Sequence, residues 1–238
     1  MTDTPAALRE AHHADVSGGW LRPAVFGAMD GLVTNIALIA GVGGGGVSPR
    51  SIVLTGTAGL VAGAISMGLG EYTSVRSANE QVAAEVAKER RELERHPEAE
   101  ARELAEMWVA RGLPADLARQ VAAAVRRDPE LALRMHVREE LGVDPDDQPS
   151  PWAAATSSFL FFSVGALVPL LPYLLGATSL ALALAVGGLG LFLAGAVVSR
   201  FTNRAWWSGG LRQLLVGGAA AVATYLIGML IGVQGGLG

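Results

Sequence analysis

The sequence predicts an all-α membrane protein with five transmembrane helices and a helical domain outside the membrane. The chain has 238 residues, of which 51% are hydrophobic, and five apolar segments are long enough to cross a hydrocarbon core about 30 Å thick. Charge is also strongly partitioned, because 18 of the 22 acidic residues lie between Glu71 and Asp147. Cysteine is absent, which excludes disulfides and thiolate metal ligands.

The predicted spans are residues 23–44, 52–74, 153–175, 178–199 and 212–234. Because neither Gly nor Pro occurs from Glu71 to His96, the second span is expected to continue beyond the membrane as one long helix. Glycine and proline then delimit three shorter helices, at about 98–111, 115–127 and 130–141. The chain therefore divides into an N-terminal segment (1–22), helices 1–2 (23–75), a helical metal-binding domain (76–150) and helices 3–5 (151–238).

The basic residues predict an orientation. If the amino terminus is cytoplasmic, every Lys and Arg except Arg50 falls on the inner side, as the positive-inside rule requires. The amino terminus and residues 76–150 are then cytoplasmic, and the carboxyl terminus lies outside. The first residues lack the layout of a signal peptide, and Arg almost replaces Lys, which favours a bacterial inner membrane. The net charge of −4 argues against a nucleic-acid partner.

One carboxylate, Asp30, lies inside the first apolar span. An ionisable group at that depth is costly and marks a functional site. Met67 is expected at nearly the same depth, since Asp30 follows Arg22 by eight residues and Met67 precedes Arg76 by nine. A carboxylate beside a thioether suits a divalent transition metal. The alternative is that Met67 packs between helices and Asp30 forms a hydrogen bond with a neighbouring serine or glycine backbone.

Thr34 and Glu71 extend this candidate site. Thr34 lies one helical turn from Asp30, and Glu71 lies one turn from Met67, so each shares a face with its neighbour. Glu71 is therefore a further candidate ligand.

Carboxylates also recur along the predicted cytoplasmic helices. Glu89 and Glu92 belong to a stripe with Glu85 and His96, Glu100 and Glu103 are three apart, and His136 lies within a turn of Glu139 and Glu140. Three such helices folded together would form a metal-binding cage. Glu and Arg also interleave in EVAKERRELER, a pattern more typical of a solvated face with i,i+4 ion pairs, and spacing alone favours that alternative.

Several motifs occur in an order that resembles the vacuolar iron transporter family. They are MDGLVTNIALIAG, AGAISMGLGEY, RRELERHPEAEAREL, REELG and GALVPLLPY, and the resemblance covers about residues 20–235. It implies a homodimer with five transmembrane helices per subunit, an ion path between the two first helices, and a cytosolic metal-binding domain that extends the second helix. It also implies movement of Fe²⁺, and often Mn²⁺, out of the cytosol in exchange for protons.

The resemblance also implies residue roles. The pathway aspartate falls on Asp30 and the pathway methionine on Met67, while the cytosolic glutamates fall on Glu89, Glu92, Glu100, Glu103 and Glu140. The chain departs from the pattern at two places. His136 and Val137 stand where a methionine pair is expected, and Gly59 stands where some members carry an acid. Imidazole is a good ligand for iron, manganese and zinc, so His136 is a candidate metal ligand.

The sequence thus predicts a proton-coupled exporter of divalent metal, with Fe²⁺, Mn²⁺, Zn²⁺ or Co²⁺ as cargo and no resident cofactor. Its predicted partners are a second copy of itself, metal ions, protons and the lipid bilayer. Protonation of Asp30 from the outer side would release the metal. The alternative is a membrane-anchored sequestering or sensing module, and a passive channel is a further one. An enzyme is not expected, because a di-iron site would need Glu-x-x-His pairs on facing helices.

Overall fold

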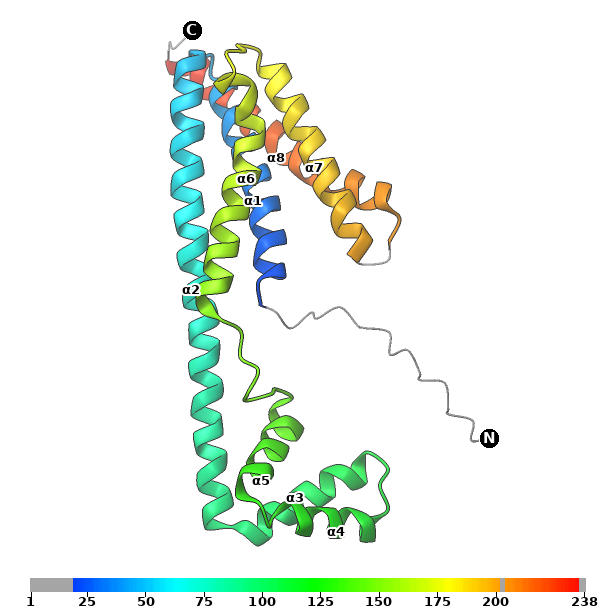
Figure 1. Ribbon diagram of the computed structural model, residues 1–238. Coiled ribbons are helices and arrows are strands. Elements are labelled where there is room, and N and C mark those ends of the chain that lie inside the picture. Colours follow the sequence, from blue (N-terminus) through cyan, green and yellow to red (C-terminus); the bar gives the residue numbers. More distant parts are fainter. Residues whose placement is uncertain (1–18, 202–203, 236–238) are drawn as a thin grey trace, which may run out of the picture.

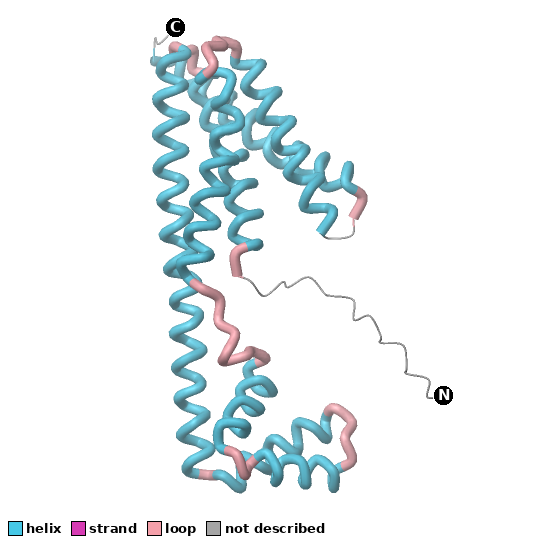
Figure 2. Tube along the Cα trace, in the orientation of Figure 1, coloured by secondary structure: helices cyan, strands magenta, loops and turns pink. Residues whose placement is uncertain are grey.

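A computed structural model describes residues 19–201 and 204–235, and within these ranges the chain consists of helices and short connections (Figures 1 and 2). The helices are α1 (Leu21–Gly44), α2 (Pro49–Arg95), α3 (Pro97–Ala110), α4 (Ala115–Val125), α5 (Pro129–His136), the π-helical turn η1 (Val137–Leu141), α6 (Pro151–Leu174), α7 (Leu180–Phe201) and α8 (Trp206–Gly235). Residues 1–18 of the predicted N-terminal segment lie outside the described residues.

Three of the helices begin at a capping residue followed by proline. Ser48 accepts a hydrogen bond from Ser51 N at 3.3 Å at the start of α2, and Ser150 accepts one from Ala153 N at 3.3 Å at the start of α6. Asp128 accepts from Glu130 N and from Leu131 N, both at 3.1 Å, and so begins α5. The cap satisfies free N–H groups of the first turn, and proline at the first helical position loses no hydrogen bond.

The five predicted spans are confirmed. Helices α1, α2, α6, α7 and α8 are each long and apolar enough to cross a membrane. The last one begins at Trp206, six residues earlier than predicted. The predicted continuation of the second span is confirmed as well, since α2 has 47 residues and ends at Arg95. At 1.5 Å per residue it is about 70 Å long, more than twice the hydrocarbon thickness. Figure 1 shows its second half running away from the bundle alongside α5.

Aromatic residues mark one boundary of the membrane part. Trp20, Trp152 and Trp206 lie at the starts of α1, α6 and α8. The ring of Trp152 lies 4.8 Å from that of Tyr72 on α2, centroid to centroid. The Ser157 hydroxyl of α6 donates to Trp20 O at 2.8 Å. Tryptophan and tyrosine favour the membrane–water interface, so α2 leaves the membrane near Tyr72. Residues 76–150 form the helical part beyond this boundary, and we call them the polar domain.

The membrane bundle is built around α1 and α6, which pack along most of their lengths. Glycines allow this close approach: a Cβ at Gly31 would lie 2.9 Å from Ala166 N, and one at Gly165 would lie 3.1 Å from Leu32 N. Helix α2 covers another side of α6, and α7 and α8 form a hairpin that leans away from α2 (Figure 1). Small residues at helix contacts are typical of membrane bundles, in which close packing replaces the hydrophobic effect.

Candidate metal sites

Three helices of the polar domain bring Glu89, Glu100 and His136 together. One ligand atom of each residue lies within 4.8 Å of those of the other two. Glu89 and His136 are buried, with 6% and 2% of their surfaces exposed, and Glu100 is partly buried. Two carboxylates and one imidazole at this separation form a suitable ligand set for a divalent transition metal. We call these three residues the acidic cluster.

The imidazole of His136 has a fixed orientation. Its Nδ1 lies 2.8 Å from Ala132 O one turn earlier, and its Nε2 lies 3.1 Å from the main-chain oxygen of Glu100. A histidine ligand is commonly oriented by a hydrogen bond from its other ring nitrogen to a carbonyl. The Ala132 carbonyl can hold Nδ1–H in this way, which leaves Nε2 to face the cluster.

Glu89 has an unusual environment for a carboxylate. Its Oε1 is buried and has no hydrogen-bond partner among the described residues. Burial, together with the negative charges of Glu140, Glu100 and Glu92, raises the pKa of Glu89 to about 7, although His136 opposes the shift. A buried oxygen without a partner, surrounded by like charges, is a position at which a cation would be strongly stabilised.

The other predicted carboxylates surround the acidic cluster. Burial and the charge of Glu103 raise the pKa of Glu100 and also that of Glu140. Glu92 acts on both residues in the same direction. The six candidate residues of the polar domain therefore lie within electrostatic reach of one another. The solvated-face interpretation is wrong for Glu89, but it holds for Glu85 and His96, which are exposed. The role of the six as metal ligands stays a prediction.

The π-helical turn η1 separates two adjacent glutamates. Glu139 forms an ion pair with Arg111 and accepts a hydrogen bond from Trp108 Nε1 at 3.3 Å. Glu140 instead interacts with the carboxylates around the acidic cluster. Such turns occur frequently at functional sites because they alter which side chains share a face. Spacing in the sequence placed the two glutamates in one group. It did not reveal that Glu139 contacts Trp108 of α3 and Arg111 at the end of that helix.

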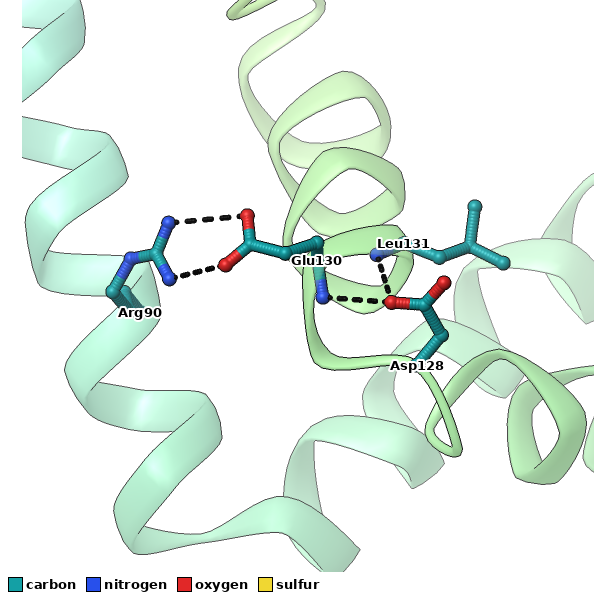
Figure 3. Close-up of polar contacts among 4 residues, drawn as sticks. All are labelled: Arg90, Asp128, Glu130 and Leu131. Atoms are coloured by element: carbon teal, nitrogen blue, oxygen red, sulfur yellow. Dashed lines mark hydrogen bonds and ion pairs between the residues drawn. The ribbon is translucent and has the colours of Figure 1, made fainter.

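An ion pair joins α5 to the long helix beside the cluster. Arg90 donates to both oxygens of Glu130, at 2.6 and 3.3 Å, and Asp128 caps the helix that carries Glu130 (Figure 3). Arg90 follows Glu89 directly, and Glu130 precedes His136 on α5. The pair therefore fixes the position of α5 against α2 near the acidic cluster. Sequence analysis anticipated i,i+4 pairs along α2 and missed this contact between residues 40 apart.

The membrane candidates lie on α1 and α2. Asp30 is partly buried and accepts a hydrogen bond from Thr34 Oγ1 at 3.4 Å, so the two share a face as predicted. Met67 packs against the cluster formed by Ala64, Phe162 and Ala166. This contact agrees with the packing interpretation of Met67 and leaves its predicted ligand role untested.

Helix α6 relates the depths of these two residues. A Cβ at Gly27, one turn before Asp30, would lie 3.2 Å from Phe162 N. A Cβ at Gly68, next to Met67, would lie 3.3 Å from Ala155 O and from Phe159 Cβ. Gly31, directly after Asp30, lies against Phe162 and Ala166, and Met67 packs against the cluster that contains these two residues, so the two candidates lie within about two turns of each other along α6. Glu71 lies next to Tyr72, at the membrane boundary, and so stands between Met67 and the polar domain.

Five membrane-length helices joined to a polar domain with a carboxylate–imidazole cluster define an integral membrane protein with a candidate metal site. Residues 21–229 match the VIT family, and the chain belongs to that family. It is 33% identical to vacuolar iron transporter 1 of Oryza sativa subsp. japonica, over 98% of this chain and 94% of that protein. It is 34% identical to the vacuolar iron transporter of Acanthamoeba castellanii, over 93% and 86%.

A third relative, vacuolar iron transporter 1 of Arabidopsis thaliana, is 29% identical over 92% of this chain and 90% of that protein. The family resemblance predicted from the sequence motifs is therefore confirmed. These relatives are named as transporters, so the chain belongs to a family of transporters and not of enzymes, as expected.

Proposed function

We propose that this protein exports divalent transition metal from the cytosol across a membrane in exchange for protons, with Fe²⁺ as the principal cargo. The observation that carries the proposal is the acidic cluster of Glu89, Glu100 and His136 in a chain whose relatives are named iron transporters. Mn²⁺, Co²⁺ and Zn²⁺ are further candidate cargoes, because a set of carboxylate and imidazole ligands accepts all of these ions.

The polar domain captures the metal. Glu89 and Glu100 supply carboxylate oxygens, His136 supplies Nε2, and Glu92, Glu103 and Glu140 add negative charge around them. The carboxylates must be deprotonated to bind, so capture releases protons to the cytosol. The metal then passes Glu71 at the membrane boundary and reaches Asp30.

The membrane path lies between two subunits. Asp30 and Met67 of both copies hold the partly dehydrated cation, and protonation of Asp30 from the outer side releases it. Gly31, next to Asp30, lies against Phe162 and Ala166, and Met67 packs against the cluster that contains them, which supports a similar depth. A pair of carboxylates contributed by two subunits offsets the charge of a divalent ion in a region where an isolated charge is costly.

The proposed orientation places the amino terminus and the polar domain in the cytosol and the carboxyl terminus outside. A bacterial inner membrane fits the composition, whereas the relatives are named for the vacuole. The direction is the same in both cases, because transport into a vacuole also removes the ion from the cytosol.

The test is uptake of Fe²⁺ into inside-out membrane vesicles with an imposed pH gradient. The wild-type protein is expected to accumulate Fe²⁺ when the lumen is acidic, and the Asp30→Ala variant is expected to lose nearly all uptake. A Glu89→Gln/Glu100→Gln variant should raise the KM about tenfold while retaining turnover at saturating metal. The matched control is Glu85→Gln, an exposed glutamate one turn before Glu89 on the same helix.

The outcomes separate the alternatives. Full uptake by Asp30→Ala would contradict the assigned path. Metal binding without any uptake by the wild-type protein would instead support the sequestering or sensing module. Uptake that is unaffected by the pH gradient would indicate a passive channel.

A further inference from the structure

The connection between α7 and α8 carries three arginines that have no acidic neighbours. Arg200 lies at the end of α7, Arg204 just before α8, and Arg212 in the second turn of α8. All three are exposed, and none of them forms an ion pair among the described residues. No Asp or Glu follows Asp147 in the sequence, so no side-chain carboxylate of α6, α7 or α8 can neutralise them. We call these three residues the arginine patch.

The arginine patch lies at the boundary of the membrane part. Trp206 and Trp207 stand between Arg204 and Arg212, and the two tryptophans are 54% and 56% exposed. Indole rings favour the interface between hydrocarbon and water. Residues 213–235 contain no charged side chain and extend about 34 Å as a helix, which is enough to cross the hydrocarbon core without the residues before them. Arg212 and the turn before it therefore lie at the level of the lipid headgroups.

The first part of α8 packs on α7 and stands away from α1. A Cβ at Gly210 would lie 2.7 Å from the Phe192 ring of α7, and the same ring meets Trp206 edge to face at 5.9 Å between centroids. Helix α8 approaches α1 closely in its later part, where a Cβ at Gly41 would lie 3.3 Å from Thr224 O. Figure 1 shows the α7–α8 hairpin diverging from α1 toward the end that carries the arginine patch. Lipid can therefore reach the patch.

We propose that the arginine patch binds the headgroup of an anionic phospholipid in the leaflet next to the polar domain. The planar set of N–H donors on a guanidinium group matches the oxygens of a phosphate. Beyond Arg212 the surface is apolar, since Leu215 and Val216 are 64% and 58% exposed. A phosphate held at the patch thus places its acyl chains along the apolar surface of α8. This inference does not depend on the proposed transport function.

Two other anions could neutralise the arginine patch. Inorganic phosphate has the charge of a headgroup but no acyl chains. The N-terminal residues 1–18, which lie outside the described residues, include Asp3, Glu10 and Asp15. A phospholipid fits best, because charged, aromatic and apolar side chains follow one another along α8 in the order in which headgroup, interface and acyl chains follow one another in a leaflet.

The experiment measures lipid binding to the full chain in detergent micelles. Brominated phosphatidylglycerol and brominated phosphatidylcholine are titrated separately, and quenching of tryptophan fluorescence reports their binding. An arginine at a membrane surface favours anionic lipid about fivefold, so the wild type is expected to prefer phosphatidylglycerol at least about tenfold. The triple variant Arg200→Gln/Arg204→Gln/Arg212→Gln is expected to bind the two lipids equally, and replacement of the same three residues by Lys should keep most of the preference.

Two further variants control for total charge and for location. The matched charge control replaces three exposed arginines of the polar domain that form no ion pair among the described residues, and it should keep the full preference: Arg91→Gln/Arg102→Gln/Arg127→Gln. The variant Trp206→Phe/Trp207→Phe should lose most of the quenching, because the bound lipid lies beside these two rings.

Several results would overturn the inference. Equal affinity of the wild type for the two lipids would do so, as would equal losses of preference in the two Gln triple variants. Relief of quenching by inorganic phosphate, but not by chloride at the same ionic strength, would assign the patch to the free anion. A preference that appears only after removal of residues 1–18 would assign it to that segment. If the Gln variant of the patch does not fold, Arg212→Gln decides, and an unchanged preference in that variant would contradict the proposal.

Discussion

His136 Nε2 lies 3.1 Å from the main-chain oxygen of Glu100, whose carboxylate belongs to the same acidic cluster. In this structure the nitrogen that a metal would use therefore lies at the contact between α5 and α3. Metal binding would exchange this contact for coordination, and the two helices would then be connected through the ion.

The His136→Ala variant is expected to bind Zn²⁺ more weakly by roughly 10- to 100-fold, the range found when groups that support a metal site are removed. Mn²⁺ should be affected less, since carboxylates are its preferred ligands. Competition titrations with a chromogenic chelator on the detergent-solubilised full chain would measure both constants. Equal losses for the two metals would mean that His136 has a packing role only.

The second prediction concerns pH. Burial and neighbouring carboxylates raise the pKa of Glu89 to about 7, so the folded metal-free protein binds this proton more tightly than the unfolded chain does. Stability from this group is therefore fully present at pH values below the ordinary glutamate range and is lost as pH rises through about 7. The thermal unfolding midpoint of the metal-free protein should decrease as the pH is raised from 5.5 to 8. In the Glu89→Gln variant this decrease should be smaller.

Glu85→Gln is the control for this experiment, since Glu85 is exposed. Metal affinity should show the opposite trend and increase with pH, because protons compete with the metal for the carboxylates. A midpoint that rises with pH in the metal-free wild type, but not in Glu89→Gln, would contradict the assigned shift.

The third prediction tests the contact between Arg90 and Glu130. Both side chains are about half exposed, so their pairing contributes little to overall stability. Arg90→Gln is expected to weaken metal binding by about two- to fivefold, because α5 carries His136 to the cluster. The exchanged pair Arg90→Glu/Glu130→Arg should recover most of the loss. Recovery would distinguish a positional role from a general change in charge near the site.

The fourth prediction concerns the packing of α1 on α6. A Cβ at Gly31 would lie 2.9 Å from the main-chain nitrogen of Ala166, and a backbone atom cannot move aside as a flexible side chain can. Gly31→Ala should therefore destabilise the bundle by about 1–3 kcal/mol. Gly70→Ala is the matched control, because a Cβ there meets no atom of the described residues within 4 Å. Thermal unfolding in detergent would measure the difference, and equal midpoints would show that α1 and α6 can separate without cost.

The periodicity of the sequence was sufficient to predict the helices, but it was not sufficient to predict the acidic cluster of the polar domain. Hydropathy located the spans, and the absence of Gly and Pro after Glu71 correctly predicted that α2 continues to Arg95. Spacing alone did not distinguish a solvated stripe from a cluster at Glu89, since the difference depends on α3 and α5 folding back onto α2. The resemblance to a family selected Glu89 and Glu100, which the structure places beside His136, and their role as metal ligands stays a prediction.

Three features of the structure could not be predicted from the sequence. Arg90–Glu130 joins residues 40 apart, and Glu139 differs from Glu140 only through the π-helical turn. Asn35 is neutral, so it did not stand out in an apolar helix as Asp30 did, although its side chain is buried and its oxygen has no hydrogen-bond partner among the described residues.

The continuity of α2 fixes the distance between the two proposed metal sites. Met67 and Glu89 are 22 positions apart on one unbroken helix, which separates them by about 33 Å. An ion cannot step directly across that distance, so it must leave the polar domain and diffuse. The rigid helix therefore fixes the gap between the two proposed sites, and metal released from the polar domain would reach the membrane path only through the solution between them.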